Sequence, residues 1–195
     1  MKLSETSVQW LRTSLNADVS PDDFELAYGF EHPLIAQRAL VRQVAMAGDF
    51  QWQVQFFDGT GECMFKSNGA LTRRLYTNIP LCGARSTGPV AYNESFRLKT
   101  PFRRKKLATS VYREEEQLYA RWGVKEIQMQ AIEAGPAVWI KKFEFLPKHP
   151  GALAEAYVTW AAEMGLEGEP PANPALYPTP FLNTRPELEL FKVIA

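Results

Sequence analysis

Positively charged side chains crowd one short stretch near the middle of the chain. Four of them, at positions 103–106, stand where a predicted strand gives way to a predicted helix. A helix N-terminus exposes unpaired backbone N–H groups and the positive end of the helix dipole, which together favour an anion, usually a phosphate. The stretch is therefore interpreted as a phosphate-binding turn, and a solvated basic turn at a sheet edge is the alternative. Its cations are Arg97, Lys99, Arg103, Arg104, Lys105 and Lys106.

Two predicted strands and one predicted helix must position this turn. Val90 to Leu98 is expected to be a strand, and Val124 to Ala131 alternates apolar and polar residues as a second strand does. Between them, Leu107, Val111, Leu118 and Trp122 lie along one helical stripe, and Gly123 follows where a helix wants a left-handed residue. A strand–helix–strand unit of this kind predicts two neighbouring parallel strands.

Some conspicuous side chains are interpreted as purely structural. The run Glu114–Glu116 in the predicted helix is expected to be a solvated face. The five tryptophans do not interleave with the basic turn, so they are expected in the core or lining a groove, and not as a platform for stacking nucleic-acid bases.

The N-terminal part is predicted to begin with helices. Ser4 is a candidate cap for the first helix, and Ser20-Pro21-Asp22-Asp23 is typical of a second helix start. A third helical stretch is expected from about Pro33, with Ile35, Leu40, Val41 and Val44 on it. From Phe50 to Phe56 the apolar residues alternate as in a half-buried strand, Asp58-Gly59 predicts a hairpin turn, and Cys63 and Phe65 fall on the expected return strand.

The C-terminal part predicts two more helices and a proline-rich tail. A short helix is expected over roughly Gly135 to Lys142, followed by a brief strand at Phe143–Phe145 and an amphipathic helix from Leu153 to Met164. The tail from Gly168 is expected to wrap the surface or to be partly mobile.

The order of elements predicts an α/β (α+β) fold with a mixed, twisted sheet and flanking helices. A length of 195 residues suits one domain, since domains commonly run to roughly 100–200 residues. We therefore expect a single domain over 1–195, with N-terminal helices in 1–48, the sheet and the anion site in 50–147, and a C-terminal helix with the tail in 150–195.

The phosphate turn resembles a known motif. Phe102-Arg103-Arg104-Lys105-Lys106-Leu107-Ala108 is similar to the pyrophosphate loop of the GCN5-related N-acetyltransferase (GNAT) superfamily, Q/R-x-x-G-x-G/A, with Arg103 first and Ala108 last. The following helix, the Gly123-Val124 turn and the strand through Ala131 also resemble that family, as do the segments 135–139 and 143–145. The chain is thus identified as a divergent member of the superfamily, and the resemblance covers roughly residues 90–147.

The resemblance implies a GNAT-like fold, an acyl-CoA such as acetyl-CoA as co-substrate, and transfer of its acyl group to an amine of a small molecule or peptide. It places the backbone of Leu98 and Lys99 beside the thioester and the pyrophosphate on the turn. Glu94 is the first candidate for the base that takes the amine proton, and Glu133 is the second. An ordinary solvent-facing glutamate is the alternative for each. The candidate cofactor-binding residues are Leu98, Lys99, Arg103, Arg104, Lys105, Lys106, Leu107 and Ala108.

Two departures from the family pattern leave a second interpretation open. Lys106 stands where the loop normally has glycine, and the position that often carries a tyrosine acid is Ile140 or nearby, with no tyrosine between Tyr119 and Tyr157. The alternative is a catalytically reduced domain that binds CoA or a protein partner without turnover. A nucleic-acid-binding module using the basic turn is a third hypothesis.

The overall composition argues against several classes of protein. With 22 basic and 22 acidic residues the formal net charge is zero, which disfavours nucleic acid as a partner. Two cysteines and two histidines make a metal site improbable, and both thiols are expected to be reduced. The N-terminus is polar and no apolar run reaches the ~20 residues of a membrane span. A cytoplasmic protein is expected, and a homodimer is left open.

Overall fold

A computed structural model describes residues 1–46, 49–66, 69–77, 88–132, 135–184 and 187–194. Its strands form one seven-stranded mixed sheet in the order β1-β2-β3-β4-β5-β7-β6, flanked by helices, which confirms the predicted fold class. The chain divides into two compact units, residues 1–127 with 193–195 and residues 128–192.

The first unit holds the N-terminal helices and most of the sheet. Its helices are α1 (Glu5–Leu15), α2 (Asp23–Tyr28) and α3 (Leu107–Arg121), with the 3-10 turn η2 at Thr100–Phe102. Its strands are β1 (Leu40–Met46), β2 (Asp49–Gln55), β3 (Leu71–Tyr76) and β4 (Val90–Ser95), and β5 (Glu126–Ile132) begins in it.

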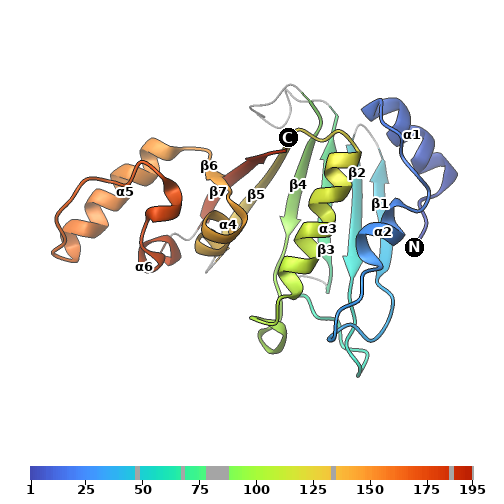
Figure 1. Ribbon diagram of the computed structural model, residues 1–195, viewed down its shortest axis with the longest axis horizontal. Helices are drawn as coiled ribbons and strands as arrows, with labels where there is room; N and C mark the ends of the chain where they lie inside the picture. Colours follow the sequence, from blue (N-terminus) through green and yellow to red (C-terminus); the bar gives the residue numbers. More distant parts are fainter. Residues whose placement is uncertain (47–48, 67–68, 78–87, 133–134, 185–186, 195) are drawn as a thin grey trace. The chain divides into compact units, whose positions relative to one another are not determined.

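Helices α1, α2 and α3 pack on one face of the sheet. Strands β1 to β4 form three successive antiparallel pairs, and β2 turns Phe50, Trp52 and Val54 into the core. Rings from each helix surround Phe50: the centroid distances are 6.2 Å to Trp10 of α1, 6.2 Å to Phe24 of α2, and 6.3 Å to Trp122 at the end of α3. Figure 1 shows α2 and α3 lying in front of these strands. Polar side chains of β2 and β3 lie on the sheet face opposite the helices, among them Gln51, Gln53 and Arg74.

Helix α3 connects β4 to β5 as the sequence predicts. Gly123 follows the helix with φ +69°, a left-handed conformation that glycine adopts without strain. The backbone N–H of Lys125 then donates to the carbonyl of Pro89 at 2.9 Å. The chain therefore enters β5 beside the start of β4, as the predicted parallel pair requires.

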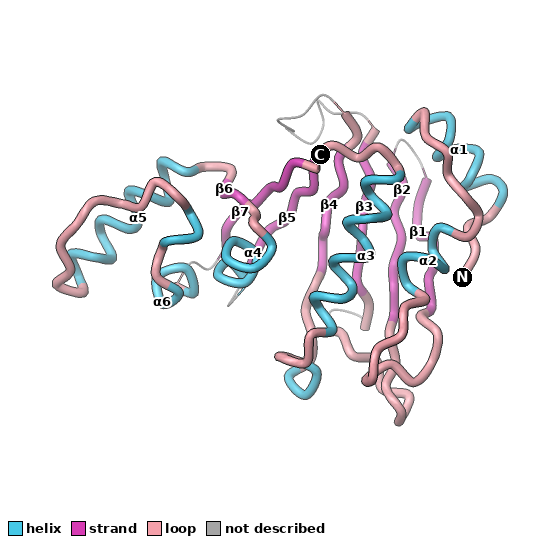
Figure 2. The backbone as a smooth tube through the Cα atoms, viewed as in Figure 1, coloured by secondary structure: helices cyan, strands magenta, loops and turns pink. Residues whose placement is uncertain are grey.

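The second unit has its own aromatic core. It contains α4 (Gly135–Phe143), β6 (Leu146–Pro147), α5 (Pro150–Glu163), the 3-10 turn η3 (Pro174–Leu176), α6 (Thr179–Asn183) and β7 (Glu187–Val193), whose last residue belongs to the first unit. β6 pairs antiparallel with β7. The ring centroid of Tyr157 in α5 lies 5.2 Å from that of Tyr177 and 5.3 Å from that of Phe181. The backbone trace is coloured by secondary structure in Figure 2.

Several local predictions are wrong. The segment expected as a third helix contains strand β1, because Leu40, Val41 and Val44 lie on an extended edge strand and not along a helical stripe. The strand expected at Phe143–Phe145 is the end of α4 followed by Glu144 at φ +61°. Cys63 and Phe65 form only isolated bridges, with Phe57 and Leu98, and the strand that returns beside β2 is β3. The proline-rich tail forms η3, α6 and β7.

No helix in the described ranges combines the length and the apolar character needed to cross a membrane.

Candidate functional site

The basic turn lies between β4 and α3. Phe102 in η2 is buried and anchors the turn, whereas Arg103, Arg104, Lys105 and Lys106 are all exposed. Arg104 and Lys106 have φ values of +61° and +64°, the left-handed region that glycine favours. Lys106 thus adopts the kind of backbone conformation that the family's glycine permits, although it carries a side chain. It is the N-cap of α3, and its side chain makes no capping hydrogen bond.

A histidine from the α2–β1 connection contacts this turn. The Nδ1 of His32 accepts the N–H of Leu34 at 3.2 Å, so in the neutral ring Nε2 carries the hydrogen and donates to the Lys105 carbonyl, also at 3.2 Å. Residues 28–33 and 35–39, among them Phe30, His32 and Arg38, line a hollow of about 670 Å³. The turn is therefore supported by a neighbouring segment and is not an isolated loop.

Strand β4 contains a β-bulge at the candidate base. Asn93 pairs with Arg73 and Ser95 pairs with Thr72, so Glu94 is an extra residue on β4. Glu94 Oε1 lies 3.1 Å from Arg74 Nε, and Gln51 donates to Glu94 Oε2 at 3.2 Å. Bulges often re-aim side chains next to active sites. Glu94 as a base stays a prediction, and Glu133 lies outside the described residues.

Glu94 belongs to a polar cluster on the sheet face opposite the helices. Arg74 Nε also lies 3.1 Å from Asp49 Oδ2, and Arg74 Nη1 donates to the Tyr76 hydroxyl at 3.1 Å. The hydrogen bond with Tyr76 is the largest cause that raises the pKa of Arg74, and the charges of Glu94 and Asp49 add to it. The side chain of Glu94 is thus held in place by its partners.

The backbone at Leu98 and Lys99 pairs with the segment at residues 64–66. The Lys99 N–H donates to the Met64 carbonyl at 2.9 Å, and the Lys66 N–H donates to the Arg97 carbonyl at 2.7 Å. The carbonyl of Leu98 accepts from Arg103 Nε at 3.1 Å. The Lys99 N–H is therefore already used within the fold, and the placement of the Leu98 and Lys99 backbone beside the thioester stays a prediction.

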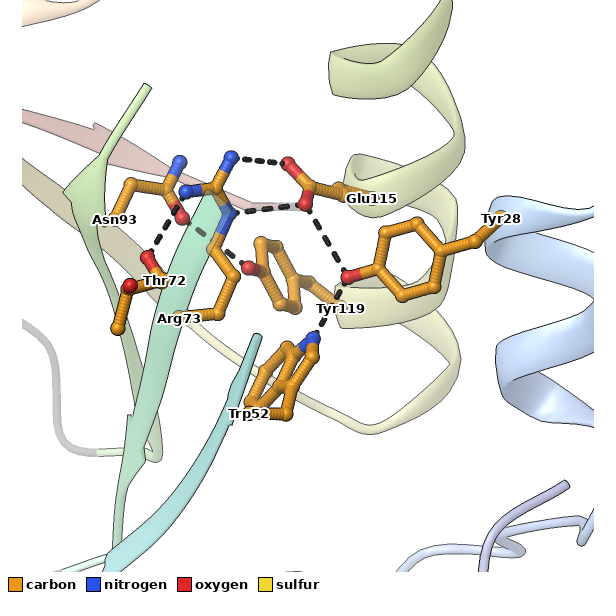
Figure 3. A network of polar contacts seen from close by, with 7 residues as sticks. All are labelled: Tyr28, Trp52, Thr72, Arg73, Asn93, Glu115 and Tyr119. Atoms are coloured by element: carbon orange, nitrogen blue, oxygen red, sulfur yellow. Dashed lines mark hydrogen bonds and ion pairs between the residues drawn. The ribbon is translucent and has the colours of Figure 1, made fainter. Parts of the chain in front are cut away.

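A buried polar network lies between the sheet and the helices (Figure 3). Arg73 of β3 and Glu115 of α3 are both fully buried and form two parallel hydrogen bonds, Nε to Oε1 at 2.9 Å and Nη2 to Oε2 at 3.0 Å. Tyr28 of α2 donates to Glu115 Oε1 at 3.2 Å, and Trp52 Nε1 of β2 donates to the Tyr28 hydroxyl at 2.8 Å. The network around this ion pair therefore connects α2 and α3 to β2 and β3.

The same network reaches β4 through a second tyrosine. The Tyr119 hydroxyl donates to Asn93 Oδ1 at 3.2 Å. Burial is the main cause that raises the pKa of both Tyr28 and Tyr119 well above the usual value, and the Glu115 charge adds to it. Burial alone would lower the pKa of Arg73, but the charge and hydrogen bonds of Glu115, together with Tyr119 and Tyr28, offset this effect and leave the pKa raised. These shifts keep Arg73 positively charged and both phenols protonated at neutral pH.

Sequence reasoning missed this network, although the sequence contained a signal for it. Arg73 lies between Leu71 and Leu75 at the alternate positions of a strand, which predicts that it points inward. Glu115 lies four residues after Val111 and three before Leu118, within the apolar stripe of the helix. The expectation that Glu115 is solvated is wrong, and an inward arginine was the partner it needed.

The comparisons with known proteins find acetyltransferases among solved structures. No protein-family model matches the chain, and no curated protein matches its sequence. An aminoglycoside 6'-N-acetyltransferase in complex with coenzyme A aligns with 76% of this chain and 74% of its own, at 12% identity and a TM-score of 0.34. An acetyltransferase of the GNAT family from Staphylococcus aureus aligns over 100% and 98%, at 10% identity and a TM-score of 0.34.

A Corynebacterium glutamicum protein described as histone acetyltransferase HPA2 and related acetyltransferase aligns over 100% of this chain and 95% of its own, at 13% identity and a TM-score of 0.37. These structures are acetyltransferases.

Proposed function

We propose that this chain is an acyl-CoA-dependent N-acyltransferase of the GNAT type, with acetyl-CoA or a longer acyl-CoA as co-substrate. The observation that carries the proposal is the turn from Arg103 to Lys106, where four exposed cations and two left-handed residues precede the N-terminus of a 15-residue helix. Backbone N–H groups, the helix dipole and the cations act together on one anion at such a place. The pyrophosphate of CoA is an anion, with a charge opposite to that of the turn.

In the proposed reaction, the amine nitrogen attacks the carbonyl carbon of the thioester. A C–N bond forms, the C–S bond breaks, and the electron pair leaves with the sulfur of CoA. The amine loses one proton, which Glu94 accepts through water and the CoA thiolate finally takes up. The acceptor is an amine of a small molecule or peptide, and the protein contributes mainly by positioning the two reactants.

The double variant Arg103→Glu with Arg104→Glu tests the anion site. It is expected to weaken CoA binding more than tenfold, because charged hydrogen bonds contribute about 1.5–3 kcal/mol each. Isothermal titration calorimetry with CoA measures the change. The matched control is Arg42→Glu with Lys125→Glu, which makes the same charge change at exposed positions of the first unit outside the turn and should leave the affinity unchanged. Equal affinities of the two double variants would refute the proposal.

A CoA-binding protein without turnover is the second candidate. Ile140, at the position where the family often has a tyrosine acid, is apolar and only 2% exposed, so it supplies no proton donor. Release of free thiol from acetyl-CoA in the presence of a panel of primary amines separates the two candidates. Amine-dependent release indicates the enzyme, and tight CoA binding with no release indicates the binder.

A further inference from the structure

Two carboxylates on the sheet face opposite the helices share one arginine. Asp49 Oδ2 and Glu94 Oε1 each lie 3.1 Å from Arg74 Nε, and the two carboxylate side chains are 23% and 26% exposed. In the part of the chain that the structure describes, no second cation lies within ion-pair distance of either carboxylate. One negative charge is therefore in excess at a half-buried place, where a cation is attracted more strongly than in open water.

The arginine of this cluster is occupied, whereas one of its carboxylates is not. Arg74 Nη1 donates to the Tyr76 hydroxyl at 3.1 Å, Nη2 donates to Gln51 Oε1 at 3.5 Å, and Nε lies between the two carboxylates. No described residue donates a hydrogen bond to the Asp49 carboxylate, although its oxygens can accept several. The cluster is therefore able to bind a cationic donor and not an anion.

Uncharged polar side chains lie beside the cluster on the same face. In the register of β2 and β3, Gln51 pairs with Arg74 and Gln53 pairs with Thr72. The side chains of Gln53 and Thr72 are half-buried, and no described residue forms a hydrogen bond with either of them. An amide and a hydroxyl can both donate and accept, as a hydroxyl group of a ligand requires. Two residues of a strand span about 7 Å, so a small molecule at the cluster can reach these groups.

A cation on β1 does not alter the charge at the cluster. Arg42 is exposed and pairs with Gln53 in the register of β1 and β2. Three strand spacings, about 14 Å, separate β1 from β4. This distance exceeds the roughly 8 Å over which exposed charges interact at physiological ionic strength. A small ligand with an acidic group would meet the excess negative charge of Asp49 and Glu94 without reaching Arg42.

These features define the class of amine that fits this face. A primary amine is protonated at neutral pH, so it arrives as a cation and is attracted by the excess charge. Resting on the proposed function, in which Glu94 takes the amine proton, we infer that the acceptor is a small amine with hydroxyl groups and no acidic group, as in amino alcohols and amino sugars. Asp49 binds its ammonium group beside Glu94, and Gln53 and Thr72 bind its hydroxyl groups.

Three ligands of one shape test the inference on the wild-type protein. trans-4-Aminocyclohexanol has the amine and a hydroxyl group, cyclohexylamine lacks the hydroxyl group, and trans-4-aminocyclohexanecarboxylate has a carboxylate in its place. Ligand-observed nuclear magnetic resonance measures the three dissociation constants. The alcohol is expected to bind about threefold to tenfold more tightly than cyclohexylamine, and the carboxylate more weakly than either. Equal affinities for the three ligands would overturn the inference.

Variants of the protein assign the two parts of the face. Asp49→Asn removes the excess charge at nearly constant shape and is expected to weaken binding of the alcohol about threefold to tenfold. Asp18→Asn, the same change at an exposed position of the first unit, is the matched control and should leave binding unchanged. Gln53→Leu with Thr72→Val should abolish the advantage of the alcohol over cyclohexylamine. Equal affinities of the two aspartate variants, or a retained advantage in the double variant, count against the inference.

A thiol-release assay with acetyl-CoA and the same three amines separates this inference from the proposed function. Release that depends on an amine but shows no preference for the alcohol overturns the inference and leaves the proposed function standing. If the wild-type protein binds the alcohol through Asp49 but does not bind CoA, the proposed function is wrong and the amine-binding face stands.

Discussion

At the scale of single residues, the ion pair between Arg73 and Glu115 is the feature whose loss should cost most. Both side chains are fully buried, and the carboxylate receives three hydrogen bonds. Glu115→Gln leaves the Arg73 charge without a counter-charge, and removal of one partner of a buried pair typically costs 3–5 kcal/mol. We expect a loss of about that size in the free energy of unfolding, measured by urea titration. Glu114→Gln, a neighbour on the half-buried side of the same helix, is the matched control and should change it by about 0.5 kcal/mol or less. Similar losses in both variants would contradict the structure.

The buried phenols at the same scale predict how stability responds to alkaline pH. The pKa of Tyr28 and Tyr119 is raised in the folded protein, chiefly by burial. Above the usual phenol pKa of about 10 the unfolded chain loses these protons and the folded chain retains them. The folded state then binds more protons, so the free energy of unfolding falls as pH rises above about 10. Tyr119→Phe should make this fall shallower. Urea titrations at several pH values between 9 and 11 measure it, and parallel curves for the two proteins would speak against the assignment.

At the scale of elements, the start of α3 depends on an unusual backbone conformation. Lys106 is exposed at φ +64°, whereas Lys105 is not in the left-handed region. Glycine at position 106 relieves the backbone strain of the left-handed conformation. Glycine at position 105 only adds flexibility to the unfolded chain. Lys106→Gly is therefore expected to be more stable than Lys105→Gly by about 1 kcal/mol in thermal unfolding.

Since the Lys106 side chain points outward, Lys106→Gly should leave CoA affinity equal or lower. A clear gain in CoA binding would favour the non-catalytic alternative.

The elements also show how far the sequence could predict the fold. Helix α3 was predicted almost to the residue, because its apolar stripe and Gly123 act locally. Strand β1 was not predicted, because an edge strand has less need to bury its apolar residues. Leu40 and Val44 are 52% and 48% exposed, so their spacing in the sequence does not indicate which residues face the core. The alternation of Glu187, Leu188, Glu189 and Leu190 in β7 was present but lay next to a proline-rich tract.

The candidate site likewise has one part that the sequence predicts and another that it does not. The basic turn follows from the local cluster of charges, so the sequence alone located it. The bulge at Glu94 and the bond between Tyr119 and Asn93 depend on strand register and on residues 26 positions apart. No local pattern encodes either of them, and they needed three-dimensional information.

At the scale of the whole molecule, the division into two units predicts that they lose structure separately. Phe181 is fully buried in the aromatic core of the second unit. Phe181→Ala should remove about 3–5 kcal/mol of stability there. Hydrogen exchange measured by mass spectrometry should become faster across residues 128–192, while α3 and β3 keep their protection. An equal loss of protection in both units would show that the chain unfolds as one.

The exposed edge of the sheet has a consequence for how copies of this chain behave when crowded. Among the described strands β1 pairs only with β2, and its ladder shifts where Val44 is inserted between Gln43 and Ala45. An unpaired edge offers its N–H and C=O groups as a template for a foreign strand, and an irregular edge interrupts the long regular run that such addition needs. The exposed charge of Arg42 on the same strand adds a desolvation cost. The inserted residue therefore protects the chain against edge-to-edge aggregation, and a deletion that made β1 regular would remove that protection.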